Sequence, residues 1–333
     1  MPRRVLITGI TGFAGSHLAE RLVASGHEVQ GVAHEPPPHP YLAAVVDRVH
    51  IQDADVLDPN AVRAAVEAAR PELIYHLAGQ AVPTLASADP LAAVRLNVIG
   101  TSNVAAALES APDAHLVAAS SADVYGIPER SPVREDEPLR PTNVYAATKV
   151  AAEAVLRDAG RRGRRVTILR PSNQIGPRQH PRLAASEFAH RIAEAEAGLA
   201  EPVIRHGQLE PRREFVDVRD MAAAYEAAGA LDHTGAEVFN VGGGAVASIG
   251  EILAILVRLA RIPIRTELDQ ERVRAGVPDA LVLSSERFRA ATGWQPVRPL
   301  DQSLSDTLDF WRRELMTDRA ERASAASGWN RGS

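Results

Sequence analysis

The apolar residues of this chain gather in short runs that recur through its first half. The runs span residues 4–8, 28–33, 49–52, 72–78, 114–119 and 165–170, and they alternate with stretches that have a helical pattern. After the first run, for example, Leu18, Leu22 and Val23 fall on one side of a helix. Strands that alternate with helices imply right-handed crossovers, which build a parallel sheet covered on both faces. The pattern therefore predicts an α/β fold.

The pattern changes near residue 171, where Gly and Pro begin to interrupt the chain and the elements become short. We interpret this region as a smaller second domain that closes over the first, with the ligand in the cleft between them. The first domain is expected to comprise residues 1–171 with a returning segment at about 214–241, and the second mainly 172–315. Residues 319–333 are rich in Ala, Ser, Gly and charge, and are expected to form a flexible tail.

A glycine-rich turn follows the first apolar run directly. Gly9, Gly12 and Gly15 have the spacing G-x-x-G-x-x-G, and the amphipathic stretch after them completes a strand, a turn and a helix. Gly9 would allow the tight turn, and Gly12 would let backbone N–H groups approach a pyrophosphate. Gly15 would let the helix pack close to the strand, with its positive N-terminal end towards the phosphates. The turn predicts a dinucleotide cofactor; the alternative is a glycine-rich turn without a ligand.

The end of the second apolar run should meet the ribose of the adenosine. An acidic residue there would bind the 2′-hydroxyl of NAD, whereas a cation would accept the 2′-phosphate of NADP. The chain has Ala33 and His34 at this point, with Glu35 just beyond. Because there is no acid at the first position, the sequence favours NADP(H) over NAD(H), with His34 facing the phosphate. The alternative is that His34 is a solvated loop residue before Pro36.

Proton-transfer chemistry is indicated by Ser121, Tyr145 and Lys149. On a helix, Tyr145 and Lys149 would lie one turn apart on the same face, so the ammonium can lie near the phenol. A free phenol has a pKa near ~10, and a nearby cation is expected to lower it because it favours the phenolate. A hydroxyl such as that of Ser121 can bond the same reacting oxygen. These groups could move a proton on or off a sugar or alcohol oxygen, although a lone Tyr-x-x-x-Lys is usually ordinary helix surface.

Composition narrows the class of protein. The chain of 333 residues has 45% hydrophobic and 24% charged residues, as ordinary globular proteins do. Its net charge of −5 provides no basic surface for nucleic acid or anionic membrane, and no apolar run reaches the ~18 residues of a membrane span. There is no cysteine, and the 11 histidines form no pair of the His-Glu-x-x-His type, so neither a disulfide nor a metal site is expected. The first run begins almost at Met1 without a signal peptide, and we expect a cytoplasmic enzyme.

Six motifs occur in the order that is typical of one family. They are the glycine turn with Thr8 before it, Leu77-Ala-Gly-Gln80, Asn97-Val-Ile-Gly-Thr101, Ser120-Ser-Ala-Asp-Val-Tyr-Gly126, Tyr145-x-x-x-Lys149 and Arg170-Pro-x-Asn-x-x-Gly-Pro177. From about residue 4 to about residue 315, the chain resembles the extended short-chain dehydrogenases/reductases of the NAD-dependent epimerase/dehydratase family, which act on nucleotide sugars. The resemblance implies a Rossmann domain with a doubly wound parallel sheet that binds NAD(P), and a smaller C-terminal domain that binds the nucleotide sugar.

The resemblance also implies functional residues at matching positions. The catalytic residues would be Ser121, Tyr145 and Lys149, with Asn97 in support. The cofactor would be bound by Gly9, Thr11, Gly12, Phe13, Ala14, Gly15, His34, Asp55, Val56, Leu77, Ala78, Gly79, Asn97, Ser120, Tyr145 and Lys149. The nucleotide sugar would be bound by Asp123, Asn173, Arg178, Arg213 and Arg274. In the family, the arginine at position 274 belongs to an Arg-Pro-x-(Asp/Glu) motif, but here Ala275 and Val277 replace the proline and the acid. This departure puts the contacts to the nucleotide ribose, and guanine specificity, in doubt.

Within the family, residues 173–225 are most similar to reductases of GDP-4-dehydro-6-deoxy-D-mannose. This resemblance implies reduction of the C4 keto group by NAD(P)H to give GDP-D-rhamnose. The nearest competitors, the GDP-mannose 4,6-dehydratases, have Asp-Glu or Ser-Glu just after the active-site hydroxyl, because they remove a C5 proton and expel the C6 hydroxyl. Here the pair is Ala122 and Asp123. Ala122 cannot transfer a proton, and Asp123 is one methylene shorter than Glu, so elimination is disfavoured.

Three further functions stay open. A nucleotide-sugar 4-epimerase would keep its cofactor bound, and a reductase that forms GDP-6-deoxytalose would use the same residues. A cofactor-binding sensor of the same fold would be free to lose Ser121, Tyr145 and Lys149, so their presence argues against it. Family members often dimerise through the helix with Tyr145 and the helix around Leu91 to Leu108, and a homodimer is expected by this analogy.

Overall fold

The structure is a computed structural model, and it describes residues 1–273 and 281–328. Contacts between residues divide the chain into two compact units. The first unit comprises Met1–Gln174, Glu214–Gly244 and Leu281–Val297. The second unit comprises Ile175–Arg213, Ala245–Ala280 and Arg298–Ser333.

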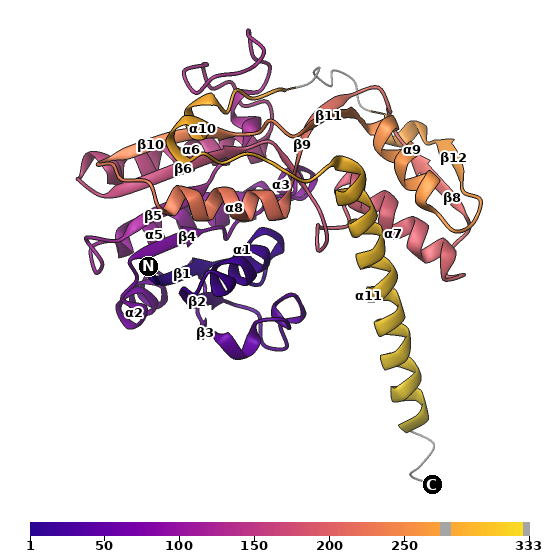
Figure 1. Cartoon of the computed structure of the whole chain (residues 1–333), viewed down its shortest axis with the longest axis horizontal. Helices are drawn as coiled ribbons and strands as arrows, with labels where there is room; N and C mark the ends of the chain where they lie inside the picture. Colours follow the sequence, from indigo (N-terminus) through magenta and orange to yellow (C-terminus); the bar gives the residue numbers. More distant parts are fainter. Residues whose placement is uncertain (274–280, 329–333) are drawn as a thin grey trace. The chain divides into compact units, whose positions relative to one another are not determined.

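A seven-stranded sheet forms the centre of the first unit (Figure 1). Its strands lie in the order β10-β6-β5-β4-β1-β2-β3, and every neighbouring pair is parallel. They are β1 (Arg4–Thr8), β2 (Glu28–Ala33), β3 (Val49–Asp53), β4 (Leu73–His76), β5 (His115–Ala119), β6 (Arg165–Pro171) and β10 (Ala236–Val241). From β1 the chain builds outwards through β2 and β3, and then through β4, β5 and β6 on the other side. The prediction of a doubly wound parallel sheet is confirmed, and so are its six predicted strands.

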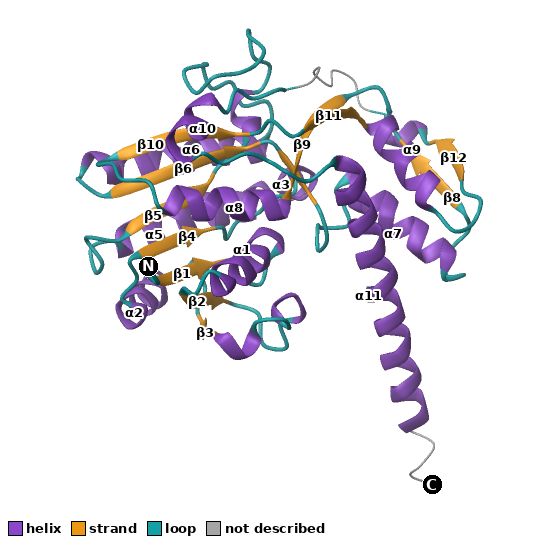
Figure 2. Ribbon diagram, viewed as in Figure 1, coloured by secondary structure: helices purple, strands orange, loops and turns teal. Residues whose placement is uncertain are grey.

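Helices cover both faces of this sheet, and Figure 2 shows how regularly they alternate with the strands. They are α1 (Phe13–Ala24), α2 (Pro59–Ala69), α3 (Pro83–Ala88), α4 (Pro90–Val94), α5 (Gly100–Ala107), α6 (Val144–Arg161), α8 (Val218–Gly229) and α10 (Glu286–Thr292). α1 packs against α8 on one face, and α2, α5 and α6 are neighbours on the other (Figure 1). Each face buries its own apolar core; Leu18 and Phe239 belong to one, and Val104 and Leu156 to the other. Burial on both faces explains the nearly continuous apolar runs of central strands such as β1 and β4, whereas the edge strand β3 is only partly buried.

The second unit is smaller and contains α7 (Ala184–Glu196), β8 (Val203–His206), α9 (Ile249–Leu259), β12 (Arg265–Leu268) and α11 (Leu300–Gly328). β8 and β12 form a parallel pair. The Arg312 guanidinium fixes α11 on α7 through two bonds of 2.7 Å to the Glu196 carboxylate. α11 continues to Gly328, so the segment expected to be a flexible tail from residue 319 begins inside a helix.

A further sheet of three strands contains β7 (Asn173–Ile175), β9 (Arg212–Asp217) and β11 (Ala245–Ser248), in the order β11-β9-β7. The remaining helical pieces are the 3₁₀ turns η1 (Pro40–Leu42), η2 (Val46–Arg48), η4 (Ala122–Tyr125) and η5 (Gln270–Arg272), and the π-helical turn η3 (Arg95–Ile99). Among the described helices, none combines the length and the apolar character that crossing a membrane would require.

Candidate active site

The glycine turn joins β1 to α1 at the edge of the sheet where the parallel strands end. Gly9 has a φ of 75°, and a Cβ at this position would lie 2.7 Å from the backbone nitrogen of Ala78. A Cβ at Gly15 would overlap the carbonyl oxygen of Gly9, so only glycine lets α1 pack this close. Gly12 is the N-cap residue of α1 and offers no side chain to the first N–H groups. These N–H groups and the positive end of the helix dipole suit a phosphate, so the turn fits the pyrophosphate of a dinucleotide.

Buried His76 ties the ends of β1 and β4 to α5. Its Nδ1 lies 2.7 Å from Thr8 Oγ1, and its Nε2 lies 2.9 Å from Thr101 Oγ1. Thr101 donates its single hydroxyl hydrogen to the carbonyl oxygen of Asn97, so Nε2 of His76 must be the donor and Nδ1 the acceptor. Burial, and then the charge of Lys149, lower the pKa of His76 to about 3. The imidazole is therefore neutral at physiological pH and acts as a fixed structural link.

Ser121, Tyr145 and Lys149 lie together at the same edge. Asn143 is the N-cap residue of α6, and its side chain accepts a bond of 2.9 Å from the backbone N–H of Ala146, which places Tyr145 in the first turn. Ser121 follows β5 and is hydrogen-bonded to the phenol of Tyr145. Lys149 Nζ donates to the carbonyl oxygen of Ala119 at 3.0 Å and lies 6.0 Å from the centre of the Tyr145 ring. The structure thus makes neighbours of the three residues that the sequence singles out.

The pKa of Tyr145 is raised, whereas the sequence analysis expects it to be lowered. Burial of the phenol is the main cause, the charge of Asp123 adds to it, and the hydrogen bond with Ser121 acts in the opposite direction. The expectation is wrong because burial is the largest cause of the shift, and because the Lys149 ammonium is directed to the backbone. Tyr145 therefore keeps its proton at neutral pH, as a proton donor must.

Asn97 links the loop after β4 to the first turn of α6. It is 1% exposed and lies in η3, between α4 and α5. Its Oδ1 accepts from the backbone N–H of Gln80 at 2.7 Å, and its Nδ2 donates to the carbonyl oxygen of Gln80 at 3.1 Å. Nδ2 also donates to Thr148 Oγ1 at 2.9 Å, and Thr148 in turn donates to the carbonyl oxygen of Tyr145. Asn97 thereby supports the helical turn that holds the phenol.

The other cofactor candidates follow the ends of neighbouring strands. Asp55 and Val56 come after β3, and Val56 is buried. Gly79 comes after β4, where a Cβ would lie 2.9 Å from Asn97 Oδ1 and 3.6 Å from Lys149 Nζ. Because parallel strands end at one edge, these residues and the glycine turn line the same rim of the sheet. The turns on this rim also contain Thr11, Leu77 and Ala78, and α1 begins there with Phe13 and Ala14.

The end of β2 carries the residues expected to select the cofactor. Ala33 is buried, and His34 and Glu35 are exposed. Thr11 in the glycine turn donates a hydrogen bond of 3.1 Å to the Glu35 carboxylate. The nearest acid to the predicted ribose position is therefore already bonded to the turn, and the last residue of the strand has no polar side chain.

The model of one protein family matches residues 5–242, and that family is the NAD dependent epimerase/dehydratase family. The chain belongs to it. The resemblance drawn from the six motifs is thereby confirmed, together with a Rossmann-type dinucleotide fold.

Relatives in this family include reductases and epimerases. The GDP-6-deoxy-D-mannose reductase of Pseudomonas aeruginosa is 31% identical over 319 residues, which cover 95% of this chain and 99% of the relative. The UDP-glucose 4-epimerase of Mycolicibacterium smegmatis is 32% identical over 321 residues, which cover 93% and 99%. The two identities are nearly equal, so they establish the family and not the substrate.

Solved structures of the family agree with this picture. The structure of a Pseudomonas aeruginosa protein abbreviated RMD, complexed with NADPH, has a TM-score of 0.80 at 29% identity and covers 94% of this chain and 99% of its own. The UDP-glucose 4-epimerase of Thermus thermophilus, complexed with NAD, has a TM-score of 0.81 at 30% identity and covers 93% and 99%. Both cofactors therefore occur among structural relatives.

A buried ion pair that the sequence analysis does not select lies directly behind the site. The Glu153 carboxylate accepts bonds from Arg170 Nε at 2.8 Å, Arg170 Nη2 at 2.6 Å and Ser120 Oγ at 2.6 Å. Both charged side chains are almost completely buried, at 1% and 2% exposure. A signal was present in the sequence, because Glu153 stands one helical turn after Lys149, and Lys149 is the only lysine of the chain.

The substrate candidates are divided between the two units. Asp123 acts on Tyr145 through its charge, and Asn173 donates from Nδ2 to the carbonyl oxygen of Glu214 at 3.1 Å; all of these belong to the first unit. Arg178 and Arg213 belong to the second unit, and Arg178 has a φ of 71°. Arg274 lies outside the described residues.

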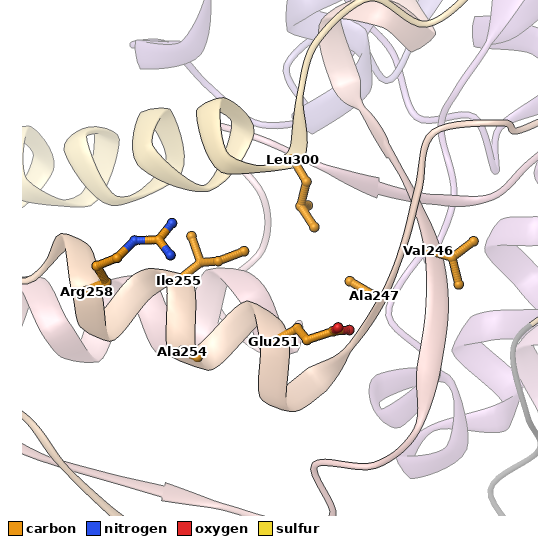
Figure 3. A pocket seen from close by; sticks show the side chains of 7 residues that line it. All are labelled: Val246, Ala247, Glu251, Ala254, Ile255, Arg258 and Leu300. Atoms are coloured by element: carbon orange, nitrogen blue, oxygen red, sulfur yellow. The ribbon is translucent and has the colours of Figure 1, made fainter.

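The second unit contains a pocket of about 360 Å³. Figure 3 shows the seven residues that line it, with Ile255 of α9 and Leu300 of α11 pointing towards each other. Its two charged residues already have partners: Glu251 accepts from the backbone N–H of Ser248 at 2.6 Å, and Arg258 pairs with Asp301 at 2.8 Å. No predicted site residue lines this pocket. The described residues also include no group of three or more His, Cys, Asp or Glu that could hold a metal ion.

Proposed function

We propose that this chain reduces the C4 keto group of GDP-4-dehydro-6-deoxy-D-mannose with NAD(P)H and forms GDP-D-rhamnose. The observation that carries the proposal is that Tyr145 is buried and protonated beside Ser121. The residue after Ser121 is Ala122, where a dehydratase would have an acid. Reduction needs one proton donor at the carbonyl oxygen. The GDP-6-deoxy-D-mannose reductase relative supports the substrate class, since its similarity extends over 95% of the chain.

Dehydration is a poorer fit to the same residues. Elimination requires a second acid or base that removes a proton from the sugar ring and assists the departing hydroxyl. The residue after Ser121 is Ala122, which is buried and cannot ionise. Asp123 is partly exposed, and its charge raises the pKa of Tyr145, which favours a phenol that holds its proton. The arrangement supports simple reduction.

The proposed mechanism assigns each group one task. The glycine turn holds the pyrophosphate, and when the cofactor is bound its nicotinamide supplies the hydride to C4. Tyr145 donates its proton to O4 as negative charge develops there, and Ser121 gives that oxygen a second hydrogen bond. Lys149 holds the nicotinamide ribose and stabilises the phenolate that remains. Positioned acid catalysis contributes typically ~10²–10⁴-fold, and orientation of the bound sugar supplies further acceleration.

The proposed cofactor preference is NADP(H) over NAD(H). Ala33 provides no carboxylate at the end of β2, the carboxylate of Glu35 is bonded to Thr11, and His34 is exposed where it can face a 2′-phosphate. Ala33→Asp should lower the ratio of kcat/KM for NADPH to that for NADH by about tenfold or more, because a carboxylate repels the phosphate and accepts from a ribose hydroxyl. The exposed variant Glu28→Asp, at the other end of the strand, serves as the control. An unchanged ratio in the Ala33 variant would contradict the assignment.

A UDP-glucose 4-epimerase is the second candidate, because relatives with that name are 32% and 30% identical to this chain. An epimerase returns the hydride to the sugar within one catalytic cycle, so it consumes no external reductant. One equivalent of NADPH consumed for each keto sugar would exclude epimerisation. Interconversion of UDP-glucose and UDP-galactose without added reductant would support it.

The decisive experiment combines the keto sugar with each reduced cofactor. Purified protein is incubated with GDP-4-dehydro-6-deoxy-D-mannose and NADPH, or with NADH, and the product is identified by NMR. GDP-D-rhamnose formed with stoichiometric oxidation of the cofactor is the expected result, and GDP-6-deoxytalose would require the opposite face of C4 to be reduced. If neither cofactor is oxidised in the presence of the keto sugar, the proposed reaction is wrong.

We also propose a homodimer. Leu91, Val94 and Ile99 are 61%, 40% and 47% exposed on consecutive turns of α4 and η3, an apolar strip that a second copy of the chain could cover. Sedimentation should show a dimer, and Ile99→Glu should produce monomers. A wild-type protein that sediments as a monomer at micromolar concentration would contradict the proposal.

A further inference from the structure

Lys149 is the only lysine in a chain with 37 lysine and arginine residues. Arginine stays charged under all ordinary conditions, whereas a buried lysine loses its proton readily. The chain therefore uses its single titratable strong cation at the predicted centre of catalysis. The groups around Lys149 decide whether it is charged at working pH.

Few charged groups face Lys149. Its own helix presents Tyr145, which is protonated, and Glu153. From β4 comes His76, which is neutral, and from β5 comes the carbonyl oxygen of Ala119, at 3.0 Å from Nζ. Burial lowers the pKa of Lys149 to about 8, and the charge of Glu153 opposes that shift. The carboxylate of Glu153 is therefore the main group that favours the ammonium.

Arg170 holds this carboxylate in place and weakens its field. Besides its two bonds to Glu153, Arg170 donates from Nη1 to the hydroxyl of Tyr125 at 2.7 Å, and its guanidinium lies 4.8 Å from the centre of that ring. Tyr125 donates onward to Asn240 Oδ1 at 2.6 Å. Burial alone would lower the pKa of Arg170, but its bonds to Glu153 raise it above the usual value. Arg170 is thus a permanent, fixed positive charge beside Glu153.

We propose that Glu153 and Arg170 are positioning residues that set the charge of Lys149. Glu153 keeps Lys149 as an ammonium and anchors Ser120 next to Ser121, and Arg170 limits how strongly Glu153 acts. The role rests on the proposed function in one respect: the charge on Lys149 matters because it supports proton donation by Tyr145. Neither residue touches the reacting atoms.

The single lysine allows a direct test without substrate. Protein labelled with ¹³C at the lysine ε-carbon gives one signal, whose shift against pH reports the protonation of Lys149. Glu153→Gln should lower the measured pKa by about one to two units, because a unit charge at this range in a partly buried site acts on that scale. The double variant E153Q/R170M should lower it by less, since the repulsion from Arg170 is also removed. Arg157→Gln is the control; Arg157 lies 3.6 Å from Glu153, is 42% exposed, and should leave the titration unchanged.

Two readouts separate this role from a structural one. The pKa of Lys149 should be lowest in E153Q, higher in E153Q/R170M, and highest in the wild type and in Arg157→Gln, which should have equal values. The pH at which kcat/KM begins to fall on the alkaline side should shift down by the same amount as the pKa of Lys149 in each variant. If Glu153→Gln does not fold, the double variant, which leaves no unpaired guanidinium in place of the Glu153–Arg170 pair, still has to show a lowered pKa of Lys149. Variants that lose melting temperature or kcat while Lys149 titrates as in wild type would overturn the proposal. The titration of Lys149 needs no sugar, so its result tests the roles of Glu153 and Arg170 even if the protein does not reduce the keto sugar.

Discussion

The two units of this protein differ in where they place their candidate site residues. In the first unit, Ser121, Tyr145 and Lys149 stand at strand ends and on a capped helix, within hydrogen bonds to one another or to the backbone. In the second unit, Arg178 and Arg213 lie in a loop and at the start of β9, both partly exposed. Relatives named for GDP sugars and for UDP sugars are equally similar to the chain. In the proposed function, the chemistry belongs to the first unit, whereas recognition of the substrate is shared by Asp123 and Asn173 of the first unit and Arg178 and Arg213 of the second.

The largest effect should come from Tyr145→Phe. The variant keeps the ring and removes the proton donor, so kcat should fall by roughly 10²–10⁴-fold while GDP and NADPH bind as before. Steady-state kinetics and binding titrations measure both quantities. Tyr41→Phe, at a 3₁₀ turn after β2, is a matched control that should keep full activity. Wild-type turnover in the Tyr145 variant would show that the proton donor is not Tyr145 of the first unit.

Gly15→Ala should have the next largest effect. The added methyl would overlap the carbonyl oxygen of Gly9, so the turn must open and NADPH should bind about 100-fold more weakly. Fluorescence titration of NADPH measures this. Gly250→Ala in the second unit is the control, because its added methyl would lie 3.3 Å from Leu209 Cβ and 3.4 Å from the Leu209 carbonyl oxygen, without the overlap found at Gly15. Equal cofactor binding in both variants would mean that the glycine turn is not the phosphate site.

Arg213→Gln tests the second unit. If Arg213 binds the diphosphate, its loss should raise KM for the GDP sugar about 10- to 100-fold, as expected when a charge-assisted hydrogen bond is removed. The value of kcat should change by less than about threefold. Arg212→Gln is the matched control, since Arg212 is an exposed neighbour that donates to the carbonyl oxygen of Val246. A fall in kcat with unchanged KM would contradict the division between the units.

The smallest effect is the pH dependence. Lys149 is an ammonium below its pKa of about 8 and becomes neutral above it. If the charged form is needed, kcat/KM should be level below about pH 8 and should fall about tenfold per pH unit above it. Activity that stays constant to about pH 9.5, well above that pKa, would show that the charge of Lys149 is not required.

Much of the first unit could be predicted from sequence because its signals are local. Short apolar runs indicate six of the seven strands of the main sheet, and the spacing of Gly9, Gly12 and Gly15 indicates the turn. The sign of the pKa shift of Tyr145 could not be predicted, since it depends on burial by residues far away in the chain. The cluster of Ser120, Glu153 and Arg170 was missed for the same reason: Ser120 follows β5, Glu153 lies in α6 and Arg170 lies in β6, and only the fold brings them together.

The π-helical turn η3 has a consequence for which changes of length the chain tolerates. An α-helix repeats about every 3.6 residues, and a π turn accommodates one residue more without breaking the helix. Deleting a single residue between Arg95 and Ile99 would restore ordinary α-helical winding and remove the wider turn in which Asn97 lies. Asn97 would then swing away from Gln80 and Thr148, although no polar side chain had been substituted. For this segment, a sequence one residue shorter is a more serious change than many substitutions.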